Sequence, residues 1–335
     1  MTLTGDITVS VIIPTKNRNE FLQRAIDSVA AQGYGSLEVC VVDNNDDPAL
    51  STGVKQLVER YRQARPQTEW TYLTSRQPYA SGVKNDGMRR AKGRFICFLD
   101  DDDQLLPGSI ALRAERMEAD PELAMLYCAG YSLIYPYPLR MYRYYRYNRK
   151  RDTDTLKMMS CSSMFINKEL FFRHHLFFDE GLSRIEDYDL CKVIIRLGLK
   201  VASMPQALVL LHQHPHERMS THTPAHFMDF RDKLVAKWGA QAEDYVFHYH
   251  AGHFLWRICF GIERIPYSRI EAELEKEFGR RPSRGFRFRH GLVSFSPMLY
   301  LALYHASLIF WQFYHNRLAP LLGKQEDWHR DKSRS

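Results

Sequence analysis

The sequence predicts an α/β fold in which a mostly parallel sheet is flanked by helices and followed by a helical C-terminal extension. Over the first hundred residues, short apolar runs alternate with helical stretches, which is the pattern of a parallel sheet covered by helices. Beyond about residue 225 the character changes to arginine-rich segments and one long apolar stretch. A chain of 335 residues suits one large domain with an appendage, so we expect an α/β domain over residues 1–225 and a helical region over 226–335.

Each expected element follows from an apolar run and the residues that bound it. The run from Val9 to Ile13 is a first strand ended by Pro14, and the near-continuous apolar run over 94–99 suits a strand buried on both faces. The polar cluster over 43–48 must be a loop. In chain order, we expect strands over 9–13, 37–42, 70–73, 94–99 and 164–166, and helices over 20–31, 52–64, 81–91, 107–119 and 187–197.

Polar segments stand at the carboxyl ends of three expected strands. They are Pro14–Arg18, Asp43–Asn45 and Asp100–Asp103. Parallel strands present these ends along one edge of a sheet, and open α/β sheets bind ligands in the crevice along that edge. The sequence therefore predicts a ligand site where the three segments converge.

The composition limits the kind of protein and its compartment. Hydrophobic residues make up 45% of the chain and charged residues 25%, values that argue against a generally disordered chain. The net charge of +7 favours anionic partners, namely nucleic acid, an acidic membrane surface or phosphorylated substrates, without choosing among them. Six cysteines without a CxxC pair indicate reduced, buried thiols, and the N-terminus lacks the features of a secretory signal. We therefore expect a cytoplasmic protein.

Four consecutive aspartates, Asp100 to Asp103, follow the fourth expected strand. Like charges at the end of a buried strand repel one another, and desolvation raises their pKa values unless a cation compensates. Carboxylate oxygens suit Mg²⁺ or Mn²⁺, ions that complete their coordination with water and substrate phosphates. A helix N-terminal cap before Pro107 is the alternative, although one or two acids would suffice for a cap.

Five motifs occur in order over roughly residues 7–220, and together they resemble the inverting family 2 glycosyltransferases, which have the GT-A fold. This resemblance implies a Rossmann-like sheet, a nucleotide-sugar donor, and a saccharide or lipid-linked saccharide acceptor in the assembly of bacterial-type surface polysaccharide or glycolipid. The motifs are Val9–Arg18, Val41–Asn44, Lys84–Gly87, Phe98–Asp103 and Glu186–Asp189.

The resemblance also implies a donor site. Asp43 would accept a hydrogen bond from the imide of uracil or thymine, which favours a UDP- or dTDP-sugar, with a simple turn former as the alternative. Lys84 stands where the family usually has arginine, and it either offers a point charge to the diphosphate or lies on a solvated helix surface. The implied donor-binding residues are Pro14, Thr15, Arg18, Asp43, Lys84, Asn85, Asp100 and Asp101, and the implied ligands of Mn²⁺ or Mg²⁺ are Asp100, Asp102, Asp103 and His214.

Transfer with inversion needs a base that takes the proton from the acceptor hydroxyl. The family places this carboxylate in a Glu-Asp pair at the start of a helix, which corresponds here to Glu186 and Asp187, with Asp187 as the base. A structural role is the alternative, since acidic side chains stabilise a helix N-terminus.

Two further segments are basic or apolar. Tyrosines interleave with arginines over 135–151, a pattern compatible with acceptor binding, with a solvated loop or with single-stranded nucleic acid. Five arginines between 280 and 289 precede the apolar stretch 297–314, which favours contact of residues 280–314 with a membrane surface on the cytoplasmic side. Packing against the catalytic domain or within an oligomer is the alternative, and the stretch is short for a membrane span.

Two other functions stay open on the sequence alone. A metal-dependent sugar nucleotidyltransferase would use similar acids, but such enzymes carry a glycine-rich loop after the first strand, and residues 14–18 contain no glycine. A nucleic-acid-binding protein would use the basic stretches, but no recognisable nucleic-acid module accompanies them, so no nucleic-acid partner is expected.

Overall fold

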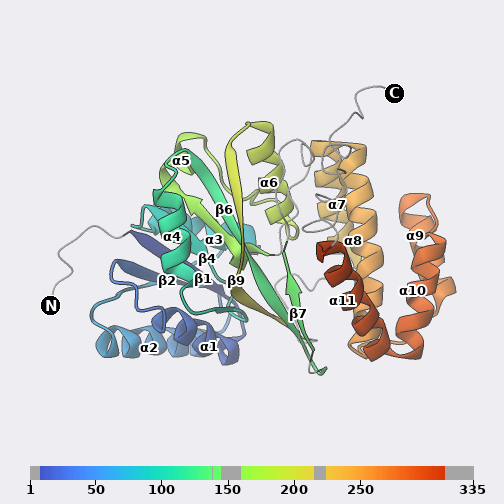
Figure 1. Cartoon of the computed structure of the whole chain (residues 1–335), viewed down its shortest axis with the longest axis horizontal. Helices are drawn as coiled ribbons and strands as arrows, with labels where there is room; N and C mark the ends of the chain where they lie inside the picture. Colours follow the sequence, from blue (N-terminus) through green and yellow to red (C-terminus); the bar gives the residue numbers. More distant parts are fainter. Residues whose placement is uncertain (1–7, 138, 145–159, 215–223, 314–335) are drawn as a thin grey trace. The chain divides into compact units, whose positions relative to one another are not determined.

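The computed structural model describes residues 8–137, 139–144, 160–214 and 224–313 (Figure 1). Within these residues the chain forms two compact units. In the described ranges, the first comprises residues 8–133, 142–144 and 160–212, and the second comprises residues 134–137, 139–141, 213–214 and 224–313. The expected boundary near residue 225 stays a prediction.

A mixed sheet forms the frame of the first unit, with the order β3-β2-β1-β4-β8-β6-β9-β5 and with β7 paired to β6. Strands β1, β2, β3 and β4 pair in parallel, whereas β8 runs antiparallel to both β4 and β6, and β5 runs antiparallel to β9. The α/β fold class is thus confirmed. The strands are β1 Val9–Thr15, β2 Leu37–Asp43, β3 Glu69–Thr74, β4 Phe95–Phe98, β5 Gln104–Leu105, β6 Leu123–Ile134, β7 Leu139–Arg143, β8 Met164–Asn167 and β9 Lys200–Gln213.

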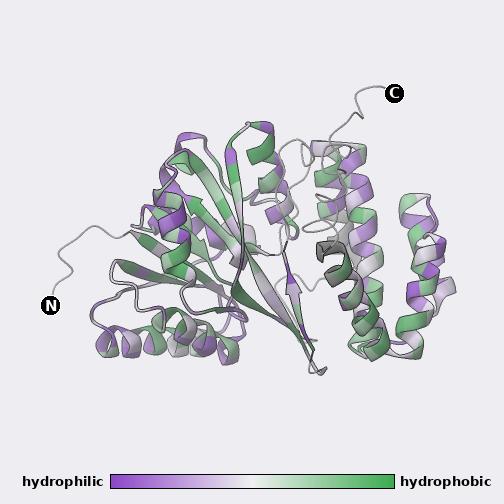
Figure 2. Cartoon of the chain, in the orientation of Figure 1, coloured by the Kyte–Doolittle hydropathy of each residue, from purple (hydrophilic) through white to green (hydrophobic). Residues whose placement is uncertain are grey.

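Helices cover both faces of this sheet. On β1, Val11 and Ile13 face a core shared with α1, α2 and α4, whereas Ile12 faces a second core shared with α3, α5 and α6. Burial on both faces explains why the central strands are continuous apolar runs, which Figure 2 shows in the hydrophobic colour. The helices are α1 Asn19–Ala30, α2 Pro48–Ala64, α3 Ala80–Arg90, α4 Ser109–Glu118, α5 Lys168–Arg173 and α6 Glu186–Arg196.

Strand β1 does not end at Pro14 as expected but continues to Thr15. The carbonyl of Ile12 accepts from Leu99 N, so alternate residues of β1, including Pro14, direct their backbone polar groups towards β4. Strand β4 ends at Phe98, opposite Ile12, and therefore presents no residue that needs an N–H from Pro14. The missing donor of proline is tolerated at such a position.

Helix α2 also differs from its expected bounds, because it begins at Pro48 rather than at residue 52. The Asp47 side chain accepts from Ala49 N, and Pro48 occupies the first turn, where its missing N–H is not needed. The sequence Asp-Pro was therefore a helix start within the segment expected to be a loop.

The second unit is mainly helical in its described part, with the ends of β6 and β9 and most of β7 added to its helices. Its core joins Ile134 and Met141 to apolar residues of helices α8 to α11. None of the helices in the described ranges is long and apolar enough to cross a bilayer. The helices are α7 Pro224–Trp238, α8 Ala240–Cys259, α9 Tyr267–Phe278, α10 Arg284–Phe295 and α11 Pro297–Phe313.

Candidate active site

The three polar segments that follow β1, β2 and β4 meet at one edge of the sheet. Thr15 Oγ1 donates to an Asp101 carboxylate oxygen at 2.7 Å, which joins the end of β1 to the aspartate run. Asn44 N donates to Thr15 O at 2.9 Å, which joins the ends of β1 and β2. The geometry therefore brings together the segments that the sequence placed along this edge.

The aspartate run is a tight turn in which Asp103 N donates to Asp100 O at 3.0 Å. Carboxylate oxygens of Asp100, Asp102 and Asp103 lie within 4.8 Å of one another and could hold a metal ion. Ser162 braces this cluster, because its hydroxyl accepts from Asp100 N at 3.1 Å and donates to the Asp103 carboxylate at 2.7 Å. Asp101 is directed elsewhere, towards Thr15 and Arg18.

Burial and like charge act together on these carboxyl groups. Burial first, and then the neighbouring aspartates, raise the pKa of Asp103 well above its usual range and the pKa of Asp101 to about 7. Burial likewise raises the pKa of Asp100, with Asp102 adding to the effect and Lys84 opposing it. An all-carboxylate donor set of this kind fits a hard divalent cation such as Mg²⁺ or Mn²⁺, which would offset both effects.

Two arginines contact the aspartate run, Arg18 just before α1 and Arg24 within it. Arg18 donates to Asp101 at 2.5 Å and to Asp102 at 3.1 Å, and these carboxylates raise the pKa of Arg18 even though burial acts to lower it. Arg24 donates to the backbone carbonyl of Asp102 at 2.8 Å. Arg24 was not singled out in the sequence, where it lies among ordinary helix-surface charges.

Asp43 is completely buried at the end of β2. One carboxylate oxygen accepts from Tyr72 Oη at 2.6 Å and the other from Asn45 N at 2.9 Å. Burial, and then the hydrogen bond to Asp43, raise the pKa of Tyr72 to about 12. Each oxygen has a further lone pair, so recognition of a nucleobase by Asp43 stays a prediction.

Lys84 is buried on α3 and not on a solvated surface, with an exposed fraction of 4%. Its ammonium donates to a Glu186 carboxylate oxygen at 2.8 Å and lies 3.2 Å from Cys161 Sγ. Despite the opposing effect of burial, the surrounding anionic groups hold the pKa of Lys84 well above its usual value. Lys84 of α3 is therefore a fixed positive charge next to the first turn of α6.

Asp187 stands in the first turn of α6, beside Glu186, and is half-buried. Its carboxylate accepts from Tyr188 N at 2.8 Å. Burial, and then the charge of Glu186, raise the pKa of Asp187 to about 6. The preceding residue, Ile185, has a φ of 49°, a left-handed conformation that is strained for a β-branched residue. A carboxyl group held in this way can exchange a proton near neutral pH.

The roles of the remaining expected site residues, Pro14 and His214, stay predictions like those of the residues above. Pro14 lies on β1, opposite Val42 of β2 in the parallel register. His214 belongs to the second compact unit, and its predicted role as a metal ligand stays a prediction.

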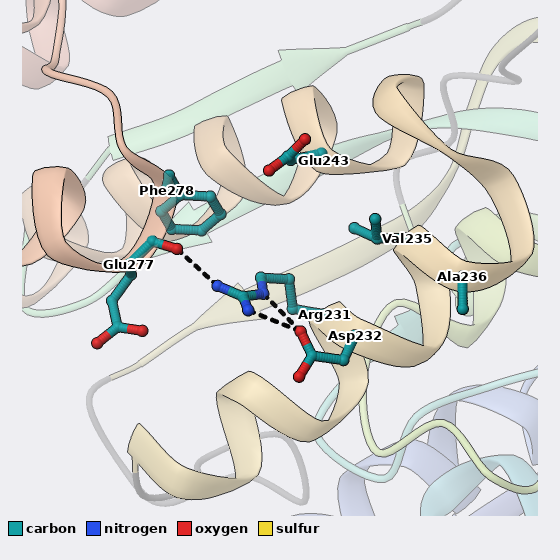
Figure 3. A pocket seen from close by; sticks show the side chains of 7 residues that line it. All are labelled: Arg231, Asp232, Val235, Ala236, Glu243, Glu277 and Phe278. Atoms are coloured by element: carbon teal, nitrogen blue, oxygen red, sulfur yellow. Dashed lines mark hydrogen bonds and ion pairs between the residues drawn. The ribbon is translucent and has the colours of Figure 1, made fainter.

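A pocket of about 400 Å³ lies within the helical unit, between α7, α8 and α9 (Figure 3). Arg231 crosses it and donates to the Asp232 carboxylate and to Glu277 O, while its guanidinium lies 5.6 Å from the Phe278 ring. Asp232 pairs with Arg231, and Glu243 and Glu277 also line the pocket, so its lining carries more negative than positive charge and does not suit an anionic ligand.

A mixed α/β sheet with carboxylates at the carboxyl edge of its parallel strands is the arrangement of the GT-A glycosyltransferases. In agreement, the structure resembles that of TarS from S. aureus solved with UDP-GlcNAc, with a TM-score of 0.52 and 17% identity, over 74% of this chain and 72% of TarS. The profile of glycosyl transferase family 2 matches residues 10–174. Residues 10–174 accordingly belong to glycosyl transferase family 2.

Similar sequences include two named bacterial glycosyltransferases. One is GalNAc(5)-diNAcBac-PP-undecaprenol beta-1,3-glucosyltransferase of Campylobacter jejuni, 35% identical over 103 residues, which are 31% of this chain and 32% of that protein. The other is the amylovoran biosynthesis glycosyltransferase AmsB of Erwinia amylovora, 24% identical over 62% of this chain and 70% of AmsB. The chain thus spans about a third of the first relative and most of the second. Both favour a glycosyltransferase over a nucleotidyltransferase or a nucleic-acid-binding protein.

Proposed function

We propose that the protein transfers a sugar from a nucleoside-diphosphate donor to an acceptor hydroxyl with inversion, with the help of a divalent cation. The single observation that carries this proposal is the cluster of Asp100, Asp102 and Asp103, whose carboxylates gather within 4.8 Å beside the partly buried cation Arg18. Three carboxylates converging at the edge where parallel strands end suit a metal-diphosphate site better than a helix cap.

The donor would occupy the sheet edge described above. Asp43 would face the base of a UDP- or dTDP-sugar, and Thr15 and Arg18 would line the nucleotide. Asp100, Asp102 and Asp103 would hold Mn²⁺ or Mg²⁺, whose charge would neutralise the departing diphosphate. Lys84, a buried ammonium, would add a second fixed positive charge close to Asp100.

Asp187 would serve as the base for the acceptor hydroxyl. A carboxyl group with a pKa near 6 is ionised at neutral pH and remains basic enough to take a proton as the oxygen attacks. Glu186 is engaged in an ion pair with Lys84. Of the two neighbouring acids Glu186 and Asp187, it is therefore Asp187 that can face an acceptor. An Asp187→Asn variant should lose transfer while keeping nucleotide affinity.

The acceptor class follows from the relatives. Their names refer to an undecaprenol-linked saccharide and to amylovoran, so we propose a saccharide or lipid-linked saccharide acceptor in bacterial surface polysaccharide or glycolipid assembly. Such assembly would place the enzyme in the cytoplasm, with access to the cytoplasmic face of the membrane.

A membrane surface would be met through residues 280–314. Phe288 and Phe295 lie seven residues apart on α10, on one face of the helix, and are 69% and 83% exposed. Arg284 and Arg289 are also exposed on this helix. Exposed aromatic residues beside arginines are typical of surfaces that dock on anionic lipid headgroups.

This docking can be tested with the full chain and with vesicles that contain phosphatidylglycerol. A Phe288→Ser/Phe295→Ser variant should lose at least tenfold in vesicle binding, whereas loss of a concentration-dependent dimer in the same variant would show that a second copy covers this face instead. Vesicle binding equal to that of the wild type would overturn the membrane proposal.

The reaction itself is tested with a panel of UDP-, dTDP- and GDP-sugars, each screened for slow hydrolysis with Mn²⁺ or Mg²⁺. We expect a uridine or thymidine donor to be hydrolysed and the rate to vanish with a chelator. This panel identifies the donor without the acceptor, and hydrolysis of a GDP-sugar alone would contradict the role given to Asp43.

A further inference from the structure

We propose that Asn85 is a positioning residue that holds the loop 178–185, and through it Asp187, in place. It does not bind the donor. This inference rests on the proposed function for the role of Asp187, but the contacts of Asn85 stand independently of it. Asn85 lies on α3, one residue after Lys84, and is completely buried.

The side-chain amide of Asn85 is committed to this loop. Its nitrogen donates to Phe178 O at 2.8 Å and to a Glu180 carboxylate oxygen at 2.9 Å, and its oxygen accepts from Phe178 N at 3.0 Å. A primary amide has two N–H groups, and both have acceptors here. A buried amide with both N–H groups occupied has none to offer to a diphosphate oxygen.

Neighbouring residues of α3 hold the same loop. Ser81 Oγ donates to Leu182 O at 3.0 Å, and Arg89 donates to Glu180 at 2.9 Å. Ser81, Asn85 and Arg89 are spaced four residues apart, which places them along one side of α3. The hydrogen bonds from Asn85, and then from Arg89, lower the pKa of Glu180, as expected where these donors stabilise its ionised form.

The far end of the loop is tied to the same helix. Lys84 of α3 pairs with Glu186, the first residue of α6, at 2.8 Å, and Lys84 also lies 5.4 Å from the centre of the Phe178 ring. The loop is therefore fixed to α3 near its start by Asn85 and at its end by Lys84. Between them stands Ile185, whose positive φ persists only if its surroundings impose it.

The consequence for catalysis is a rigid link between the donor side and the base side of the site. A base displaced by about 1 Å can slow a reaction by about a hundredfold without loss of substrate binding. Loosening the loop should therefore reduce the rate of transfer and leave nucleotide affinity almost unchanged.

The test uses Asn85→Asp, which keeps the size of the side chain and an acceptor for Phe178 N but removes both N–H groups. Hydrogen–deuterium exchange over 178–186 should become at least tenfold faster, kcat should fall about 10- to 100-fold, and the Kd for UDP with Mn²⁺ should change less than threefold. Glu180→Ala removes only the exposed partner of Asn85 and should show a smaller change of the same kind, which guards against a variant that fails to fold.

Gln32→Glu is the matched control, because Gln32 also uses its side-chain amide to hold a loop, through Leu106 O at 3.1 Å and Ile110 N at 3.3 Å. It should speed exchange over 106–110 with little change in kcat. Unchanged exchange over 178–186 in Asn85→Asp overturns the proposed link. Weakening of UDP binding by tenfold or more would show instead that Asn85 is a donor ligand, and failure of the wild type to bind UDP or hydrolyse any donor would count against the proposed function alone.

Discussion

Gly87 allows α3 to lie close to the sheet, and replacing it by alanine tests whether that close approach matters. A Cβ at this position would meet Ile12 Cγ2 at 2.5 Å and Val42 Cγ2 at 3.1 Å. Both neighbours are buried, β-branched residues of the two central strands, so neither can rotate away freely. Gly87→Ala should therefore push α3 away from the sheet.

The expected magnitude combines two opposing effects. Overpacking of a core typically costs about 1–3 kcal/mol, whereas alanine is favoured over glycine in a helix by about 1 kcal/mol. Because a 2.5 Å approach is far inside van der Waals contact, we expect a net loss of about 1–2 kcal/mol in the free energy of unfolding. Transfer activity should fall as well, because α3 carries Lys84 and Asn85.

Urea denaturation measures the loss, with Gly252→Ala as the control. Gly252 lies on α8, and a Cβ there would meet no heavy atom within 4 Å, so this change should stabilise the protein by about 0.5–1 kcal/mol through helix propensity alone. If Gly87→Ala stabilised the protein as much as Gly252→Ala does, the close packing of α3 on β1 and β2 would be wrong.

Three further predictions concern titration and buried polar groups. The charge of Glu186 raises the pKa of Asp187, and a base acts only when deprotonated. Glu186→Gln should therefore shift the rise of kcat with pH from near pH 6 to lower pH. An unshifted pH profile would argue against Asp187 as the base. Arg113 is fully buried and donates to neutral groups of Ser109 and Cys97, so Arg113→Met should change stability by less than about 1 kcal/mol in urea. A loss above about 3 kcal/mol would indicate that the charge is compensated. Tyr72→Phe removes one hydrogen bond to Asp43 and should lower stability by about 1 kcal/mol, whereas an unchanged stability would show that this bond contributes nothing.

The parallel half of the sheet could be predicted from sequence because β1, β2 and β4 are buried on both faces, which leaves unbroken apolar runs. The long strands β6 and β9 were not predicted. Strand β9 contains Pro205 and several polar residues, and its place in the sheet depends on pairing with β5, more than 90 residues earlier in the chain. Local pattern carries no information on such pairing.

The site was predictable in kind but not in detail. The aspartate run indicated a cation, yet which aspartates gather in the cluster depends on Ser162, which braces the cluster and lies 59 residues beyond Asp103. In the same way, Tyr72 binds Asp43 across neighbouring strands, and Cys161 reaches Lys84 from another part of the chain. Partners brought together only by folding leave no signal in a single sequence.

The measurement that tests the central claim most directly is the Mn²⁺ dependence of donor hydrolysis in Asp102→Asn, with Asp101→Asn as the matched control. Asp102 belongs to the carboxylate cluster, whereas Asp101 is held by Thr15 and Arg18. We predict that Asp102→Asn loses Mn²⁺-dependent turnover and measurable Mn²⁺ binding, and that Asp101→Asn still binds Mn²⁺. Full Mn²⁺-dependent turnover in Asp102→Asn would contradict a metal-assisted transfer at this cluster.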